Sequence, residues 1–152
     1  MTDAASAPEW HPGGKPTRLW VLRHGQTEMS VKKQFSGLSD PELTSHGREQ
    51  ARRAAAYVAG QLTGGAAGNA SAGSNAGPVA IYSSPLKRTR QTAEAVAEAL
   101  VTKPRVHVTE ALIEMNFGDW EGRTFAEVMD EFPLEHDACF WDSAAAPSGG
   151  ES

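Results

Sequence analysis

The stretch Leu19-Trp20-Val21-Leu22-Arg23-His24-Gly25 decides the fold of this chain. Its first four residues form a continuous apolar run, which is typical of a strand buried on both faces of a parallel sheet. The run ends abruptly in a polar turn that contains Arg23, His24 and a glycine. Open α/β sheets bind ligands just beyond the carboxyl ends of their strands. A strand over residues 17–22 therefore predicts a ligand site at this turn.

The rest of the chain continues the alternation of strands and helices that builds a parallel sheet. Thr44 can cap a helix whose residues Ala51, Ala54, Ala55 and Val58 recur at helical spacing. A serine cap and a proline at the first helical position predict the start of the next helix at Ser84-Pro85. The expected elements are strand 17–22, a loop that follows the turn at 23–25 and runs through Phe35, Gly37 and Pro41, helix 44–62, strand 79–82, helix 84–100, strand 105–109 and a short helix to about 132 opened by the capping box Thr124-x-x-Glu127, with an irregular chain after Pro133.

The composition indicates a single globular domain and excludes several classes of protein. The chain has 152 residues, enough for one domain with a core, and 39% of them are hydrophobic. A net charge of −5 argues against non-specific nucleic-acid binding, and no stretch is long and apolar enough to span a membrane. The single cysteine, Cys139, excludes an internal disulfide and favours a reducing, cytoplasmic location. Residues 1–16 are expected to be a disordered leader without a signal peptide, and residues 64–77 a flexible linker of Gly, Ala, Ser and Asn.

Three residues, His24, Arg23 and Arg88, could serve phosphoryl chemistry. The imidazole of His24 could attack phosphorus while the guanidinium of Arg23 neutralises oxygen charge, although a histidine that merely ends a strand is an equal alternative. Arg88 lies about one turn inside the helix predicted from Ser84, where free backbone N–H groups and the helix dipole favour an anion. Neighbouring Lys87 and Arg90 are expected to lie on a solvated helix face.

A carboxylic acid is needed to protonate the leaving oxygen of a phosphomonoester. Glu114 lies between apolar residues, so we expect partial desolvation to raise its pKa toward that of a general acid. Asp119 and Glu121 compete for this role, and the residues alone do not decide among the three. His136, Asp137 and Cys139 match no standard zinc spacing, so no metal is expected.

Five motifs in order resemble the histidine phosphatase superfamily, the phosphoglycerate mutase-like group, from about Thr17 onward. They are Leu22-Arg23-His24-Gly25-Gln26-Thr27-Glu28, Phe35-Ser36-Gly37, Leu43-Thr44-x-x-Gly47-x-x-Gln50-Ala51, Ser83-Ser84-Pro85-Leu86-x-Arg88-Thr89-x-x-Thr92-Ala93 and Glu114-x-x-Phe117-Gly118-x-Trp120-Glu121-Gly122. The resemblance implies a three-layer α/β/α fold with a mostly parallel sheet.

The resemblance also implies roles for individual residues. His24 would be the nucleophile that accepts the phosphoryl group, Arg23 and Arg88 would bind the phosphate oxygens, and Glu114 would be the proton donor. Further residues of the pocket would be Gln26, Thr27, Ser30, Ser36 and Gly37. Neither a metal nor another cofactor is implied.

Hydrolysis is favoured over mutase chemistry within this resemblance. The tract Asn116-Phe117-Gly118-Asp119-Trp120-Glu121-Gly122 looks like the phosphatase branch, and mutases typically carry a Trp-Asn pair where this chain has Met29-Ser30. We therefore expect a phosphomonoester hydrolase acting on a small phosphorylated metabolite. Phosphoglycerate mutase-type transfer is the alternative, and the sequence does not define the substrate or the oligomeric state.

One family feature is not found in the sequence. The resemblance implies a second pocket histidine on a strand well after the Gly149-Gly150-Glu151-Ser152 motif, which here ends the chain. The expectation is an incomplete domain over residues 17–152 that lacks a helix and a C-terminal strand. Such a chain should be unstable or aggregate and should hydrolyse phosphomonoesters poorly. A non-catalytic, phosphate-binding member remains a second alternative.

Overall fold

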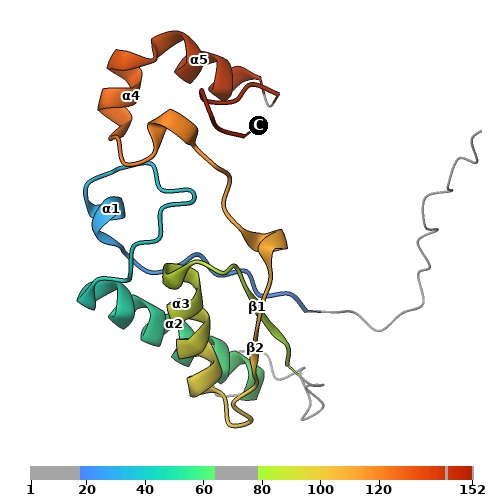
Figure 1. Cartoon of the computed structure of the whole chain (residues 1–152). Helices are drawn as coiled ribbons and strands as arrows, with labels where there is room; N and C mark the ends of the chain where they lie inside the picture. The colour runs from blue at the N-terminus through green and yellow to red at the C-terminus, as the bar shows by residue number, and fades with distance from the viewer. Residues whose placement is uncertain (1–17, 64–78, 143, 152) are drawn as a thin grey trace, which may run out of the picture.

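The structure, a computed structural model, describes residues 18–63, 79–142 and 144–151 (Figure 1). The expected leader 1–16 and linker 64–77 lie outside the described residues. The described elements are α1 (Glu28–Val31), α2 (Ser45–Thr63), β1 (Ile81–Ser83), α3 (Lys87–Ala99), β2 (Val106–Val108), the 3-10 turns η1 (Glu110–Leu112) and η2 (Gly118–Trp120), α4 (Phe125–Glu131) and α5 (Pro133–Trp141). None of the described helices is long and apolar enough to cross a membrane.

Strands β1 and β2 form a parallel pair joined by α3. Ile81 pairs with Val106 and Ser83 with Val108, and Thr109 N–H donates to the Ser83 carbonyl beyond the last pair, at 2.9 Å. Parallel strands need a crossover, and α3 supplies it as a βαβ unit. The α/β class and the parallel pairing predicted from the sequence are therefore confirmed, and the predicted strands 79–82 and 105–109 overlap β1 and β2.

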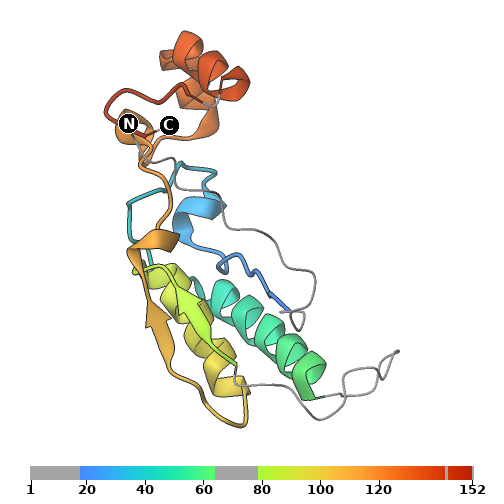
Figure 2. The same ribbon diagram turned by 90° about the vertical axis from the view of Figure 1, so that its right-hand side faces the viewer.

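The core of this unit lies where α2 packs against α3. Ala55 and Val58 of α2 and Val96 of α3, together with Leu100 after it, form one buried cluster. Both figures show the two helices side by side next to β1 and β2 (Figures 1 and 2). Thr44 caps α2 as predicted, because its hydroxyl accepts the N–H of Gly47 at 3.0 Å. The apolar spacing of α2 thus defines the helix and the face that it buries.

Helix α3 begins at Lys87, later than the sequence predicted. Ser84 does not cap it, since its hydroxyl pairs with the Thr89 hydroxyl at 2.8 Å and accepts the Leu86 N–H at 3.4 Å. The N-cap position is Leu86, with extended backbone and no side-chain cap. Asp40, from the loop before α2, instead accepts the N–H of Lys87 at 2.6 Å. A distant carboxylate therefore satisfies a free donor at the helix N-terminus, which a local motif cannot reveal.

The predicted strand over residues 17–22 is wrong for the part that the structure describes. Residues 18–26 form no regular element, and Leu19 and Val21 are 80% and 86% exposed. Trp20 alone of the apolar run packs on the core of α2 and α3, with its ring edge-on to Tyr57. A strand buried on both faces needs paired neighbours and covering layers. Among the described residues the sheet contains β1 and β2, and neither pairs with this segment.

Two further helices were not predicted. Thr27 and Ser30 form a capping box that opens α1, in a stretch expected to be a loop. Helix α5 occupies residues that were expected to be irregular, and Pro133 stands in its first turn. Proline at that position costs nothing, because its missing N–H would be unpaired there and its φ suits a helix. The irregular chain expected after Pro133 is therefore wrong for residues 133–141, because Pro133 begins α5.

The residues after β2 form a second group of packed elements around an aromatic cluster. Phe35 contacts the rings of Phe117, Trp120 and Phe125 at centroid distances of 5.1, 5.2 and 4.6 Å. Helix α4 begins at the predicted capping box of Thr124 and Glu127. Figure 2 shows α4 and α5 at the end of the molecule opposite the C-terminal end of α2. The loop that carries Phe35 therefore links the two groups.

Candidate active site

The turn that carries His24 is held by close backbone packing against α2 and by α3. An alanine Cβ at Gly25 would lie 2.3 Å from the carbonyl oxygen of Gly47, so the two backbones approach to a distance that only glycine permits. The Gly25 N–H donates to the hydroxyl of buried Thr92 in α3 at 3.2 Å. Gly47 and Thr92 both lie in the motifs quoted above, but only the folded structure shows that they support His24.

The ring of His24 is half-buried and has a defined tautomer. Its Nδ1 lies 2.8 Å from the carbonyl oxygen of Gly25. A carbonyl can only accept, so Nδ1 carries the hydrogen and Nε2 of the neutral ring carries the lone pair. Burial lowers the pKa of His24, and Arg88 and Arg23 lower it further, against the Gly25 hydrogen bond and Glu114, which raise it. A neutral imidazole with a free Nε2 is the form that can attack phosphorus.

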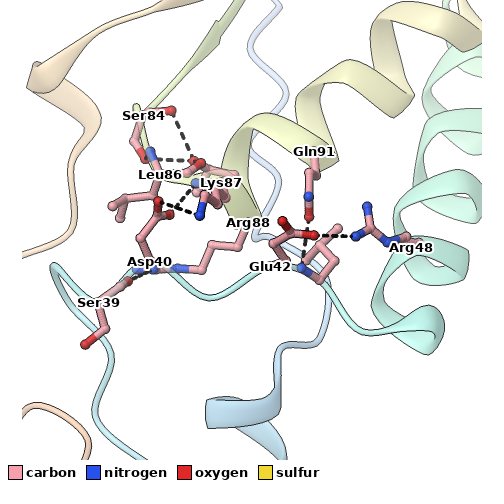
Figure 3. A network of polar contacts seen from close by, with 11 residues as sticks. Ser39, Asp40, Glu42, Arg48, Ser84, Leu86, Lys87, Arg88 and Gln91 are labelled. Carbon is pink, nitrogen blue, oxygen red and sulfur yellow. Dashed lines mark hydrogen bonds and ion pairs between the residues drawn. The ribbon is translucent and has the colours of Figure 1, made fainter.

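The two arginines of the predicted site differ in environment. Arg23 is exposed, and its charge acts on His24. Arg88 is 1% exposed, and its guanidinium donates to the carbonyls of Ser36 at 3.0 Å, Gly37 at 2.8 Å and Ser39. Figure 3 shows the Arg88 side chain reaching from α3 to the loop at Ser39 and Asp40. The Arg88 guanidinium thus holds this loop, and its contact with an anion at the helix N-terminus stays a prediction.

Three carboxylates interact electrostatically with the Arg88 guanidinium. Burial lowers the pKa of its guanidinium, and Glu114, Asp40 and Glu121 act in the opposite direction. The charge of Glu114 raises the pKa of both His24 and Arg88. The predicted nucleophile His24, phosphate ligand Arg88 and proton donor Glu114 therefore lie within electrostatic range of one another.

The three candidate proton donors occupy different environments. Glu114 is exposed, and its Oε1 accepts the Met115 N–H at 3.2 Å. The apolar enclosure expected around it is wrong for the described residues, since Ile113 and Met115 are 39% and 37% exposed. Asp119 is also exposed. Unlike Glu114, it is not among the charges that shift the pKa of His24 or of Arg88.

Glu121 has an environment that keeps it ionised. Burial raises its pKa, but the Ser39 hydroxyl and the backbone N–H groups of Leu38, Gly37 and Ser39 outweigh burial and lower it overall. A carboxylate stabilised in its charged form is a poor proton donor at neutral pH. The geometry therefore favours Glu114 over Glu121 for that role.

The remaining predicted pocket residues make internal bonds. The Gln26 side-chain carbonyl accepts from the Thr44 hydroxyl at 3.0 Å. Thr27 and Ser30 exchange capping bonds, with the Thr27 N–H 2.9 Å from the Ser30 hydroxyl and the Ser30 N–H 3.2 Å from that of Thr27. These three side chains shape the start of α1 and the approach to α2, and their contact with a substrate stays a prediction.

Ser36 and Gly37 lie beside Arg88 through their backbone carbonyls. The Ser36 hydroxyl is buried and has no hydrogen-bond partner among the residues that the structure describes. An alanine Cβ at Gly37 would lie 2.0 Å from the Met115 carbonyl oxygen and 2.5 Å from Oε1 of Glu121. Gly37 therefore allows the loop to touch the segment that carries Glu114.

In the described part of the chain, no three His, Cys, Asp or Glu side chains lie where they could hold one metal ion together. The ring of His136 lies 6.3 Å from that of Trp120, centroid to centroid, and its Nδ1 lies 3.5 Å from Oδ1 of Asp137.

Comparison with known proteins identifies the family. The pattern of the histidine phosphatase superfamily (branch 1) matches residues 19–152. The chain is 40% identical to a bifunctional protein of Mycobacterium tuberculosis over 99% of its own length and 37% of that protein. It is 38% identical to a glucosyl-3-phosphoglycerate phosphatase of the same organism, over 89% of the chain and 53% of the relative.

A solved structure of the mycobacterial glucosyl-3-phosphoglycerate phosphatase in complex with VO3 shares the fold. It superposes with a TM-score of 0.69 at 37% identity, over 86% of this chain and 57% of that one. The chain thus spans between about a third and three fifths of the length of these relatives. The family pattern covers nearly all of the chain, and the chain belongs to the histidine phosphatase superfamily, branch 1.

Proposed function

We propose that the protein hydrolyses phosphomonoesters of a small phosphorylated metabolite through a phosphohistidine on His24. The observation that carries the proposal is the state of His24: Nδ1 donates to a carbonyl, Nε2 keeps its lone pair, and Arg23, Arg88 and Glu114 all act on the ring. Relatives that are phosphatases of small phosphorylated molecules support the substrate class.

The reaction has two steps. Nε2 of His24 forms a bond to phosphorus as the ester P–O bond breaks, and Glu114 gives its proton to the leaving alcohol. Water then attacks the phosphohistidine, loses a proton to the Glu114 carboxylate and releases inorganic phosphate and free His24. Arg23 and Arg88 neutralise charge on the phosphoryl oxygens in both steps, because guanidinium groups match that geometry.

Other parts of the proposal follow from the sequence. Gln26, Thr27, Ser30, Ser36 and Gly37 line the approach to the phosphate. Residues 17–152 form an incomplete histidine phosphatase domain that follows a leader of residues 1–16. The lone Cys139 supports a cytoplasmic location, and the net charge of −5 argues against a nucleic-acid partner.

The test is hydrolysis of p-nitrophenyl phosphate by the protein and two matched histidine variants. His24→Ala removes the nucleophile and should abolish turnover, whereas His46→Ala changes an exposed histidine on α2 and should leave it intact. Turnover that survives His24→Ala would refute the proposal. Transfer of phosphate between hydroxyls of a phosphoglycerate, without net release, would favour the mutase alternative.

A further inference from the structure

Glu121 binds one side of the loop 36–39. Its Oε1 accepts the N–H groups of Gly37 at 2.8 Å and Leu38 at 3.0 Å, and its Oε2 accepts the N–H of Ser39 at 3.2 Å and the Ser39 hydroxyl. Three successive backbone donors converge on one carboxylate, which is an anion-binding arrangement satisfied from within the chain. The loop is therefore tied to Glu121 through its N–H groups.

Arg88 binds the opposite side of the same loop. Its guanidinium donates hydrogen bonds to the carbonyls of Ser36, Gly37 and Ser39. In a trans peptide the C=O and the N–H point in opposite directions. The peptide that joins Ser36 to Gly37, and the one that joins Gly37 to Leu38, each present the carbonyl to Arg88 and the N–H to Glu121. Two peptide units therefore bridge the cation and the anion.

This bridge explains how Arg88 is accommodated without a direct carboxylate partner. Its guanidinium is buried, and the described residues give it no salt bridge, only carbonyl acceptors and carboxylates at longer range. The ionised Glu121 orients the peptide dipoles so that their negative ends face the guanidinium. Gly37 permits the arrangement, because a Cβ there would meet the Glu121 carboxylate itself at 2.5 Å.

We propose that Glu121 is a positioning residue that fixes the orientation of Arg88 through these two peptides and so sets the affinity of the site for phosphate. The inference rests on the proposed function, in which Arg88 binds the phosphoryl group. Loss of the Glu121 charge frees the loop to turn its carbonyls away, and the guanidinium then loses its fixed direction. Glu121 acts on phosphate only through Arg88.

The experiment compares Glu121→Gln with Glu127→Gln in the full chain. Glu127 is the matched control, because it also accepts a backbone N–H and a hydroxyl, from Thr124 in the capping box of α4. Two readouts are taken by NMR: the Arg88 Nε–Hε resonance without ligand, and the affinity for inorganic phosphate. We expect Glu121→Gln to shift the Arg88 resonance and weaken phosphate binding about tenfold, as loss of charge-assisted hydrogen bonds implies, and Glu127→Gln to change neither.

Each outcome decides a different claim. An unchanged Arg88 resonance in a folded Glu121→Gln protein overturns the inference, as does an unchanged phosphate affinity. If the unaltered protein binds no phosphate, the proposed function fails at this site, and the Arg88 resonance alone still decides whether Glu121 orients it. If Glu121→Gln does not fold, Ser39→Ala replaces it. That variant removes one donor to Glu121 and should shift the Arg88 resonance in the same direction by a smaller amount.

Discussion

Replacing Thr92 by valine tests whether α3 holds the turn that carries the nucleophile. The Thr92 hydroxyl accepts the Gly25 N–H at 3.2 Å and donates to the Arg88 carbonyl at 2.8 Å. Both Thr92 and Gly25 are buried, so valine would keep the volume and leave the Gly25 N–H without a partner. An unsatisfied buried donor costs about 1–3 kcal/mol. We expect Thr92→Val to lower the free energy of unfolding by about that amount.

Equilibrium urea unfolding measures this difference, with Thr109→Val as the matched control. Thr109 accepts the Ala111 N–H at 3.3 Å in an exposed turn, where water can replace the hydroxyl. Thr109 caps the three-residue turn η1, and because water can replace its hydroxyl, that change should cost about 0.5 kcal/mol, the low end for a lost cap. If Thr92→Val costs no more than Thr109→Val, the Gly25 N–H has another partner in solution and the reasoning is refuted. Amide exchange at Gly25 should accelerate in Thr92→Val alone.

Three further predictions follow from the same contacts. Because burial and the two arginines lower the pKa of His24, its ring stays neutral below the ordinary value, and the acid limb of the pH–rate profile should fall only as the pH drops through the lowered pKa. An acid limb with its midpoint at or above pH 6.5, the ordinary value, would contradict this. Gly47→Ala would place a Cβ 2.1 Å from the Gln26 carbonyl oxygen and should lower the free energy of unfolding by at least about 1–3 kcal/mol, measured by thermal unfolding. Gly60→Ala, whose Cβ would meet open space in the same helix, should raise it by about 0.5–1 kcal/mol. Equal effects of the two substitutions would contradict the close approach of Gly47 to Gln26. Thr124→Ala removes the cap of α4 and should cost about 0.5–2 kcal/mol, and calorimetry that finds no change would contradict its role.

Helices with a strong local signal were predictable from the sequence. Thr44 and the spacing of Ala51, Ala55 and Val58 define α2, and Thr124 with Glu127 defines the start of α4, because caps and apolar periodicity act within a few residues. The start of α3 was not predictable, since the carboxylate at its first N–H comes from Asp40, far away in the chain.

The buried strand predicted for the apolar run 19–22 is wrong because the burial of a strand depends on its neighbours as well as on its own residues. Leu19 and Val21 have no covering layer among the described residues, so the pattern alone could not define their environment. Pro133 was misread for the related reason that proline both ends and begins helices.

In the candidate site, too, the residue types were predictable from the sequence, whereas the contacts between distant segments were not. The sequence pointed to His24, Arg23, Arg88 and Glu114, and in the structure the charges of Arg23, Arg88 and Glu114 all shift the pKa of His24. It did not indicate that Glu121 and Arg88 grip opposite sides of one loop, because that contact depends on peptide orientation.

The measurement that tests the central claim most directly is capture of the phosphoenzyme. The protein is mixed with a radiolabelled phosphomonoester, quenched in base and digested, and the labelled peptide is sequenced. Phosphohistidine survives base and is lost in acid, so we predict a base-stable, acid-labile label on the peptide that contains His24, absent in His24→Ala and retained in His46→Ala. A label on any other residue, or turnover of the ester with no label on His24 in single-turnover time points, would contradict the account.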